Sequence, residues 1–268
     1  MSLLFTAVLF VVFGLVFGSF GNATAIRLAK GESLGGRSHC PHCMHVIAWY
    51  DLFPVFSYLL LGGRCRNCKK PIALQYFMME LACSVLFLLA LASSPHNVPA
   101  AVSTAIVFFG LLLICVFDFH HQQIPDAFTA IVFVGAVASI LLRGYAAIPD
   151  ALFGAAIGIV WFGFQWVISR GTLVGSGDIW LAGAIGIWLG SGATVTMLMV
   201  SYIVGAIVAS YLILTKKMAL KKSYLPFAPF MATGSIIAFI GFNNLPLALL
   251  VIAFLGISNA YLALMIGD

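Results

Sequence analysis

Charged side chains are scarce in this sequence. Its 268 residues include only 13 lysines and arginines and 8 aspartates and glutamates, so 8% of the chain is charged, compared with roughly 25% in a soluble domain. At the same time, 63% of the residues are apolar and the mean hydropathy is +1.12. This composition excludes a water-soluble globule, a disordered chain, a coiled coil and a secreted disulfide scaffold. It indicates a protein that crosses a membrane several times.

The apolar residues fall into nine segments that are long enough, or nearly long enough, to cross a bilayer, which takes about 20 residues. The segments are 3–26, 74–93, 99–118, 125–142, 149–169, 177–190, 193–214, 226–242 and 245–265. The sixth is short, so eight spans are an alternative to nine. We predict an all-α polytopic membrane protein with eight or nine transmembrane helices. It divides into a first helix (1–26), a cytoplasmic segment (27–73) and a helical bundle (74–268).

The basic residues lie mainly on one side of the predicted topology. If the first segment runs from outside to inside, only Arg143 falls outside. The inside loops contain Arg27, Lys30, Arg37, Arg64, Arg66, Lys69, Lys70, Arg170, Lys216, Lys217, Lys221 and Lys222. The positive-inside rule accounts for this asymmetry, so the net charge of +5 indicates topology, and we do not expect nucleic-acid binding. Because no basic region precedes the first segment, we predict a retained helix and not a cleaved signal peptide.

The long polar stretch between the first two apolar segments contains two C-x-x-C pairs. Cys40 and Cys43 form the first pair, and Cys65 and Cys68 form the second. Two such turns can place four thiolates around one tetrahedral Zn²⁺ ion. Two disulfides are the alternative, although thiols stay reduced on the cytoplasmic side of a membrane. We therefore predict a structural zinc site in residues 27–73, with no open position for hydrolysis.

Four carboxylates lie within or at the ends of the apolar segments, where a charge is costly and marks a candidate functional site. They are Glu80, Asp118, Asp126 and Asp178. In the predicted topology, Asp118 and Asp178 reach the inner membrane boundary and can share one depth. Two carboxyls that share a proton can activate water and protonate a leaving amine, as in aspartic proteases. This pair is the candidate catalytic site.

The same carboxylates permit other interpretations. Asp126 follows Ile124 and Pro125 at a helix start, where an aspartate caps free N–H groups and suits the helix dipole. Asp178 follows a Gly-x-Gly turn and is also consistent with a helix cap. Glu80 is interpreted as a polar contact within the bundle. A transporter that relays protons through intramembrane carboxylates is the alternative to a peptidase.

Five motifs in order resemble those of the type IV prepilin peptidases, which are membrane aspartic proteases of the GxGD kind. They are Gly18-Ser19-Phe20-Gly21-Asn22 with Arg27-Leu28, the two C-x-x-C pairs with Trp49-Tyr50-Asp51 between them, Phe117-Asp118 with Ile124-Pro125-Asp126, Gly175-Ser176-Gly177-Asp178, and Pro226-Phe227-Ala228-Pro229-Phe230. Two positions depart from the family pattern. Trp180 replaces a lysine and Ala228 replaces a glycine. The loss of the lysine leaves the pH optimum and substrate preference open.

The resemblance implies a multi-pass enzyme of the bacterial inner membrane whose active site faces the cytoplasm. Its substrates would be type IV prepilins or pseudopilins embedded in membrane lipid, and Asp118 and Asp178 would be the proteolytic pair. Many family members then methylate the new amino terminus with S-adenosylmethionine, and the four-cysteine region is associated with those members. The sequence contains no recognisable fingerprint for the methyl-donor site.

Overall fold

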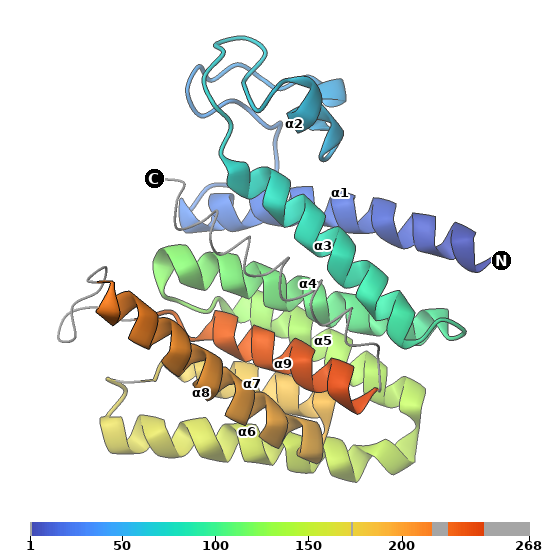
Figure 1. Cartoon of the computed structure of the whole chain (residues 1–268), viewed down its shortest axis with the longest axis vertical. Helices are drawn as coiled ribbons and strands as arrows, with labels where there is room; N and C mark the ends of the chain where they lie inside the picture. The colour runs from blue at the N-terminus through green and yellow to red at the C-terminus, as the bar shows by residue number, and fades with distance from the viewer. Residues whose placement is uncertain (1, 173, 216–224, 244–268) are drawn as a thin grey trace. The chain divides into compact units, whose positions relative to one another are not determined.

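The computed structural model describes residues 2–172, 174–215 and 225–243. These residues form nine α-helices and two short 3₁₀ helices, with no β-strand in the described part of the chain. The helices are α1 Leu3–Ala29, η1 Trp49–Leu52, α2 Phe56–Leu60, α3 Leu74–Ser93, α4 Val98–His121, α5 Asp126–Arg143, η2 Tyr145–Ala147, α6 Ile148–Ser169, α7 Ser176–Leu189, α8 Ser191–Leu214 and α9 Ala228–Phe242 (Figure 1). The all-α prediction is confirmed.

Six of these helices are long and apolar enough to span a membrane, namely α1, α3, α4, α5, α6 and α8. The helices α7 and α9 are apolar but have only 14 and 15 residues. Together the eight helices correspond to the first eight predicted segments, and α7 is the short sixth one. The chain is therefore a multi-pass membrane protein. The predicted segment 245–265 and the basic group formed by Lys216, Lys217, Lys221 and Lys222 lie outside the described residues.

The first of two compact units comprises residues 2–91 of the described chain. Its two long helices, α1 and α3, cross at Gly14 and Gly18, which form a G-x-x-x-G pattern. A Cβ atom at Gly14 would lie 2.5 Å from the Cα atom of Ser84, and one at Gly18 would lie 2.7 Å from the Cα atom of Glu80. Such close backbone approach is how small residues join membrane helices. The crossing fixes the position of Glu80 against α1.

The second unit contains α4 to α9. Its shortest helix, α7, contacts α5, α6, α8 and α9, and the run from Leu181 to Gly186 is completely buried. An apolar helix that is surrounded on all sides need not be amphipathic. The burial of α7 explains how a helix too short to span a bilayer is held inside the bundle, with its amino-terminal Gly175-Ser176-Gly177-Asp178 sequence at one end.

The crossing of α6 and α7 depends on two glycines, and we predict that enlarging one of them destabilises the second unit. A Cβ atom at Gly154 would collide with the backbone of Gly186 and Gly190. Gly154→Leu should therefore lower the free energy of unfolding by at least about 3 kcal/mol, the upper end of ordinary overpacking. Gly163→Leu is the matched control on the same helix, because no atom lies within 4 Å of a Cβ there. Equal thermal unfolding midpoints for the two variants in detergent would contradict the prediction.

Candidate active site and four-cysteine centre

Asp118 lies in the last turn of α4 and is buried, with a relative exposure of 6%. Its Oδ2 atom accepts a hydrogen bond of 3.1 Å from the backbone N–H of Ala228. Ala228 is the first residue of α9, and the first N–H groups of a helix have no partner within the helix. Two motifs 110 residues apart in the sequence therefore meet at this carboxyl. The sequence reasoning had no signal for this contact.

Asp178 occupies the third position of α7. Its Oδ2 atom accepts a hydrogen bond of 3.0 Å from the backbone N–H of Gly175, the residue that precedes the helix. The predicted N-cap position of Asp178 is wrong, because Gly175 occupies it. Asp178 instead reaches back from the third helical position to the N–H of the N-cap residue, as the third residue of a capping box does. The bond uses one side of one oxygen and leaves the other carboxylate oxygen available for chemistry.

The structure brings Asp118 and Asp178 to the same end of the second unit. A Cβ atom at Gly177 would lie 2.9 Å from the Cβ atom of Ile124, so the first turn of α7 packs on the connection that follows α4. Asp178 is the next residue of α7, and Asp118 lies in the last turn of α4 before the same connection. The glycine before Asp178 is thus required for close approach as well as for the turn.

Three helix starts surround this end of the unit. The helices α5, α7 and α9 begin at Asp126, Ser176 and Ala228, and a helix amino terminus carries partial positive charge that favours carboxylates. Asp126 is exposed and lies in the first turn of α5, while Pro125 occupies the N-cap position with no side-chain capping bond. The predicted capping role of Asp126 is wrong, because the chain turns at the proline one residue earlier. Its favourable placement in the helix dipole remains.

The two positions that depart from the family pattern have different surroundings. Ala228 is 1% exposed, and its backbone N–H is the donor to Asp118. The methyl group in place of a glycine hydrogen therefore leaves the hydrogen bond intact. Trp180 is 65% exposed on α7, so its side chain faces out of the bundle.

The four cysteines of the two C-x-x-C pairs converge in the first unit. The Sγ atoms of Cys40, Cys43, Cys65 and Cys68 all lie within 4.8 Å of one another, and those of Cys40 and Cys68 are 3.8 Å apart. A tetrahedral zinc ion with Zn–S bonds of about 2.3 Å has sulfur–sulfur edges of about 3.8 Å. All six cysteines of the chain are free thiols, so the alternative of two disulfides is not seen. The donor set fits a closed four-sulfur metal site.

The two halves of this centre have the same backbone pattern. In the first half, the N–H of Cys40 donates to the carbonyl oxygen of His45, and the N–H of Met44 donates to that of Cys40. In the second half, the N–H of Cys65 donates to the carbonyl oxygen of Lys70, and the N–H of Lys69 donates to that of Cys65. Met44 and Lys69 both have positive φ values, 56° and 59°. This repetition predicts two equivalent metal-binding turns.

Backbone N–H groups favour the thiolate form that binds a metal. The N–H groups of Cys68 and Asn67 lower the pKa of Cys65 to about 7. In the other turn, the N–H of His45 lowers the pKa of Cys43. The Asn67 side chain also donates to the Cys43 sulfur across the two turns, at 3.7 Å.

The segment around the cysteines is held by two arginines. Arg66 forms a two-bond ion pair with Asp51, at 2.7 Å between Nη2 and Oδ1 and 2.9 Å between Nε and Oδ2. The hydrogen bonds and charge of Arg66 lower the pKa of Asp51. Arg27, near the end of α1, donates to the carbonyl oxygens of Leu34 and Gly36. The resemblance motifs around Arg27 and Asp51 therefore serve to fold this segment.

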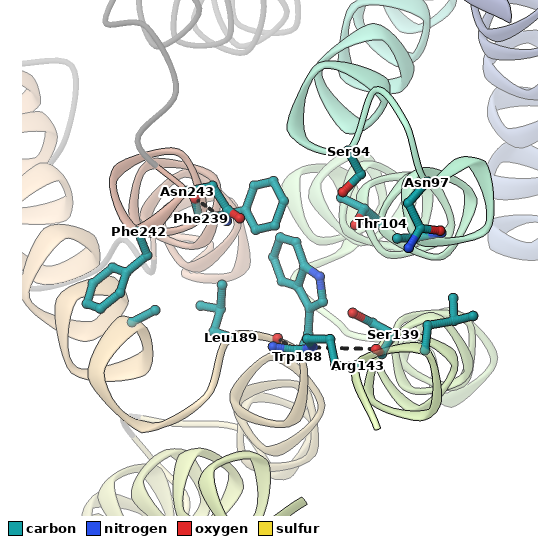
Figure 2. A pocket seen from close by; sticks show the side chains of 13 residues that line it. Ser94, Asn97, Thr104, Ser139, Arg143, Trp188, Leu189, Phe239, Phe242 and Asn243 are labelled. Carbon is teal, nitrogen blue, oxygen red and sulfur yellow. Dashed lines mark hydrogen bonds between the residues drawn. The ribbon is translucent and has the colours of Figure 1, made fainter. Parts of the chain in front are cut away.

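Each unit also contains a cavity. The one in the first unit has a volume of about 910 Å³ and lies between the four-cysteine segment and the facing ends of α1 and α3. The one in the second unit is smaller, about 140 Å³, and Figure 2 shows the side chains that line it. There Arg143 donates to the carbonyl oxygen of Trp188 at 2.7 Å. Both residues lie near the ends of their helices, opposite the helix starts that surround the aspartates. None of the lining residues is a carboxylate, histidine or cysteine, so this smaller cavity lacks the groups for proteolysis.

The comparisons with known proteins cover both units. The family model described as the Bacterial Peptidase A24 N-terminal domain matches residues 12–94, and the one described as the Type IV leader peptidase family matches residues 105–210. No solved structure matches the chain.

Several curated proteins are similar to the chain over most of its length. A "Type 4 prepilin-like proteins leader peptide-processing enzyme" from Escherichia coli O78:H11 is 32% identical over 205 residues, covering 75% of this chain and 74% of the relative. A "Prepilin leader peptidase/N-methyltransferase" from Bacillus subtilis is 33% identical over 231 residues, with 85% and 92% covered. A protein of the same description from Aeromonas hydrophila is 32% identical over 208 residues, with 76% and 71% covered.

Proposed function

Because this chain belongs to the Type IV leader peptidase family, we propose that it removes the leader peptides of type IV prepilins or pseudopilins at the cytoplasmic face of the bacterial inner membrane. The relatives are peptidases by description and the chain is a multi-pass membrane enzyme. The transporter alternative has no support among them.

The observation that carries this proposal is the convergence of the helix ends that carry Asp118 and Asp178 at one end of the second unit. In the proposed reaction, one carboxylate accepts a proton from water as the water oxygen attacks the scissile carbonyl carbon. The other carboxyl gives its proton to the leaving amine as the C–N bond breaks. The N–H of Ala228 holds the Asp118 carboxyl in one orientation, and the bond from Gly175 does the same for Asp178.

The substrate fits this arrangement through its own topology. A prepilin carries a short basic leader before an apolar helix, so the helix lies in the bilayer while the leader stays on the cytoplasmic side. The scissile bond then lies at the membrane boundary. Asp118 is in the last turn of α4 and Asp178 is in the first turn of α7, at the same end of the second unit.

We further propose that the enzyme methylates the new amino terminus, as the descriptions of its relatives suggest. S-Adenosylmethionine would supply an electrophilic methyl group. Zn²⁺, held by Cys40, Cys43, Cys65 and Cys68, would be structural, because four thiolates leave no open coordination position. Its contribution would be to fold the segment between α1 and α3.

The proposed function is tested by incubating purified full-length protein in detergent with a prepilin and S-adenosylmethionine. Mass spectrometry of the product should show loss of the leader, followed by the gain of one methyl group on the new amino terminus. An intact prepilin after incubation would contradict the peptidase assignment. A cleaved but unmethylated product would contradict only the methyltransferase assignment.

The proposed orientation predicts which loops are accessible from each side. Thr172 lies in the turn before α7, and Tyr145 lies between α5 and α6 at the other end of the bundle. In intact cells, a membrane-impermeant maleimide should label Tyr145→Cys and not Thr172→Cys, and in inverted vesicles the pattern should reverse. Peptide-resolved mass spectrometry separates these sites from the native cysteines. Labelling of both variants from the same side would require the topology to be redrawn.

A further inference from the structure

The cavity of the first unit has no part in the proposed proteolysis, because both aspartates belong to the second unit. Its volume of about 910 Å³ lies at the upper end of the range of about 300–1,000 Å³ for small-molecule sites. The four-cysteine segment forms one wall, and residues of α1 and α3 form the other. A cavity of this size can hold a small molecule together with the end of a peptide.

A buried carboxylate lies in the wall of this cavity. The Glu80 side chain is 7% exposed, and its Oε2 atom accepts a hydrogen bond of 2.7 Å from the backbone N–H of Val55. The Ser19 side chain on α1 also bonds the carboxylate. Val55 has a φ of 63°, which is unfavourable for a β-branched residue, so the backbone is strained where it meets Glu80.

Glu80 has no cationic partner in the described part of the chain, where the single ion pair joins Arg66 and Asp51. A carboxylate withdrawn from water is costly unless a positive group accompanies it. Arg27, Lys30 and Arg66 also line the cavity, but none of them forms an ion pair with Glu80. The part of the wall at Glu80 is therefore suited to a ligand that brings its own positive charge. The predicted role of Glu80 as a polar contact explains its hydrogen bonds to Val55 and Ser19. It does not explain why this buried carboxylate has no cation beside it.

Glu80 lies near the beginning of an apolar membrane-spanning helix. Glu80 is the seventh residue of α3, so it lies about 9 Å along the helix from its start. Once the leader is removed, the new α-ammonium group stands at the head of an apolar helix near the membrane boundary. This ammonium group is a cation that could pair with the Glu80 carboxylate.

The rest of the wall provides aromatic surface. Tyr58 and Phe77 line the cavity, with ring centroids 5.2 Å apart, and Tyr76 lines it as well. Aromatic faces stack on flat rings and attract cations such as a sulfonium. A nucleoside that carries a sulfonium methyl group fits this combination of aromatic and apolar lining.

We propose that this cavity is the site of methyl transfer, and that Glu80 binds the new α-ammonium group and accepts its proton. The inference rests on the proposed function, since cleavage creates the amino terminus. Once one proton has moved to Glu80, the nitrogen lone pair attacks the methyl carbon of the sulfonium donor. The N–C bond forms as the S–C bond breaks, and the bonding electrons stay on sulfur as a neutral thioether. The positive charge ends on the methylated nitrogen.

The first test is Glu80→Gln, which keeps the size of the side chain and an acceptor for Val55. Methylation of the cleaved pilin should fall at least about 100-fold, the lower range for removal of an acid–base group, while leader cleavage stays within about twofold. Arg37→Gln is the control, because Arg37 is exposed and does not line the cavity, so its variant should methylate normally. Methylation by Glu80→Gln within about twofold of the unaltered protein would overturn the proposal.

A binding measurement separates the role of Glu80 from a general loss of structure. A mature-pilin peptide with a free amino terminus should bind the unaltered protein about tenfold or more tightly than it binds Glu80→Gln, because a hydrogen bond to a charged group is lost. The same peptide with an acetylated amino terminus should bind both proteins equally. An equal loss for the two peptides would show that Glu80 does not recognise the ammonium group.

The location of the donor is tested by filling the cavity. Ala23 lines it from α1, whereas Ala29 on the same helix does not. Ala23→Phe should abolish the binding of radiolabelled S-adenosylmethionine in equilibrium dialysis, and Ala29→Phe should retain it. Retained donor binding by Ala23→Phe would place the methyl donor elsewhere. If the unaltered protein cleaves but does not methylate, the methyltransferase part of the proposed function fails, and this result is distinct from each of the outcomes above.

Discussion

Replacing either Asp118 or Asp178 with asparagine is expected to abolish leader cleavage. Asparagine keeps the shape of the side chain but can neither accept a proton from water nor donate one to the leaving amine. Because both roles belong to one reaction, the loss should exceed about 10³-fold for each variant. The rate of leader removal from a purified prepilin, followed by gel electrophoresis or mass spectrometry, measures the effect. The double variant should be no worse than either single one, since the two groups act as a unit.

The matched control for this experiment is Asp126→Asn. Asp126 lies at the same end of the bundle but is exposed, and it makes no capping hydrogen bond at the start of α5. Its replacement should weaken only the favourable interaction with the helix dipole, which is about 0.3–1 kcal/mol at an exposed position. Cleavage should then remain within about tenfold of normal. If either Asp118→Asn or Asp178→Asn inserts normally in the membrane and cleaves at close to the normal rate, the assignment of this pair as the catalytic residues is wrong.

The residue that donates to Asp118, Ala228, allows a second mutational test of the same site. The hydrogen bond to Asp118 comes from the backbone of Ala228. Replacing the side chain therefore changes the packing at this position but keeps the hydrogen-bond donor. Restoring the family glycine with Ala228→Gly should leave cleavage within about twofold, since Gly and Ala provide the same N–H group. An alanine in place of the family glycine should therefore be tolerated, because the backbone donor is unchanged. This argument does not apply to Trp180, whose side chain is exposed and replaces a lysine.

Hydropathy predicted the helices of this chain well, because a membrane span has a strong and continuous signal. Each of the eight apolar helices in the described residues overlaps one predicted segment, and α7 is as short as expected. The prediction could not say why α7 is short. Its burial against α5, α6, α8 and α9 depends on glycines such as Gly154 and Gly186, whose close contact no local pattern reveals.

The candidate site was predictable only in part. Intramembrane carboxylates and paired cysteines stand out in a sequence because they are costly or geometrically demanding. The bond from Ala228 to Asp118 has no such signal, since every residue except proline carries the same backbone N–H group. Glu80 was visible as an unusual charge, but its position in a cavity wall depends on the fold of a segment with little regular structure. Residues 27–73 carry no periodic pattern from which that fold could be derived.

The four-cysteine segment links the metal site to the proposed methyl transfer, and its disruption should separate the two activities. In the variant Cys40→Ser/Cys43→Ser, the zinc ion should be lost, because two of its four ligands are removed. Structural zinc contributes about 10 kcal/mol or more to the folding of small metal-binding units. Without it, the segment that forms one wall of the cavity should lose its structure, and methylation should fall below detection.

Leader cleavage should persist in this variant within about tenfold of the normal rate, because Asp118, Asp178 and their hydrogen-bond donors all belong to the second unit. The matched control is Cys83→Ala/Cys115→Ala, which removes two cysteines from the apolar helices α3 and α4 and should leave the zinc content unchanged. Elemental analysis of protein purified under reducing conditions measures the metal, and product mass measures both activities. Absence of zinc from the unaltered protein would contradict the assignment of the metal. Equal loss of cleavage and methylation in the serine variant would show that the peptidase also depends on the zinc segment.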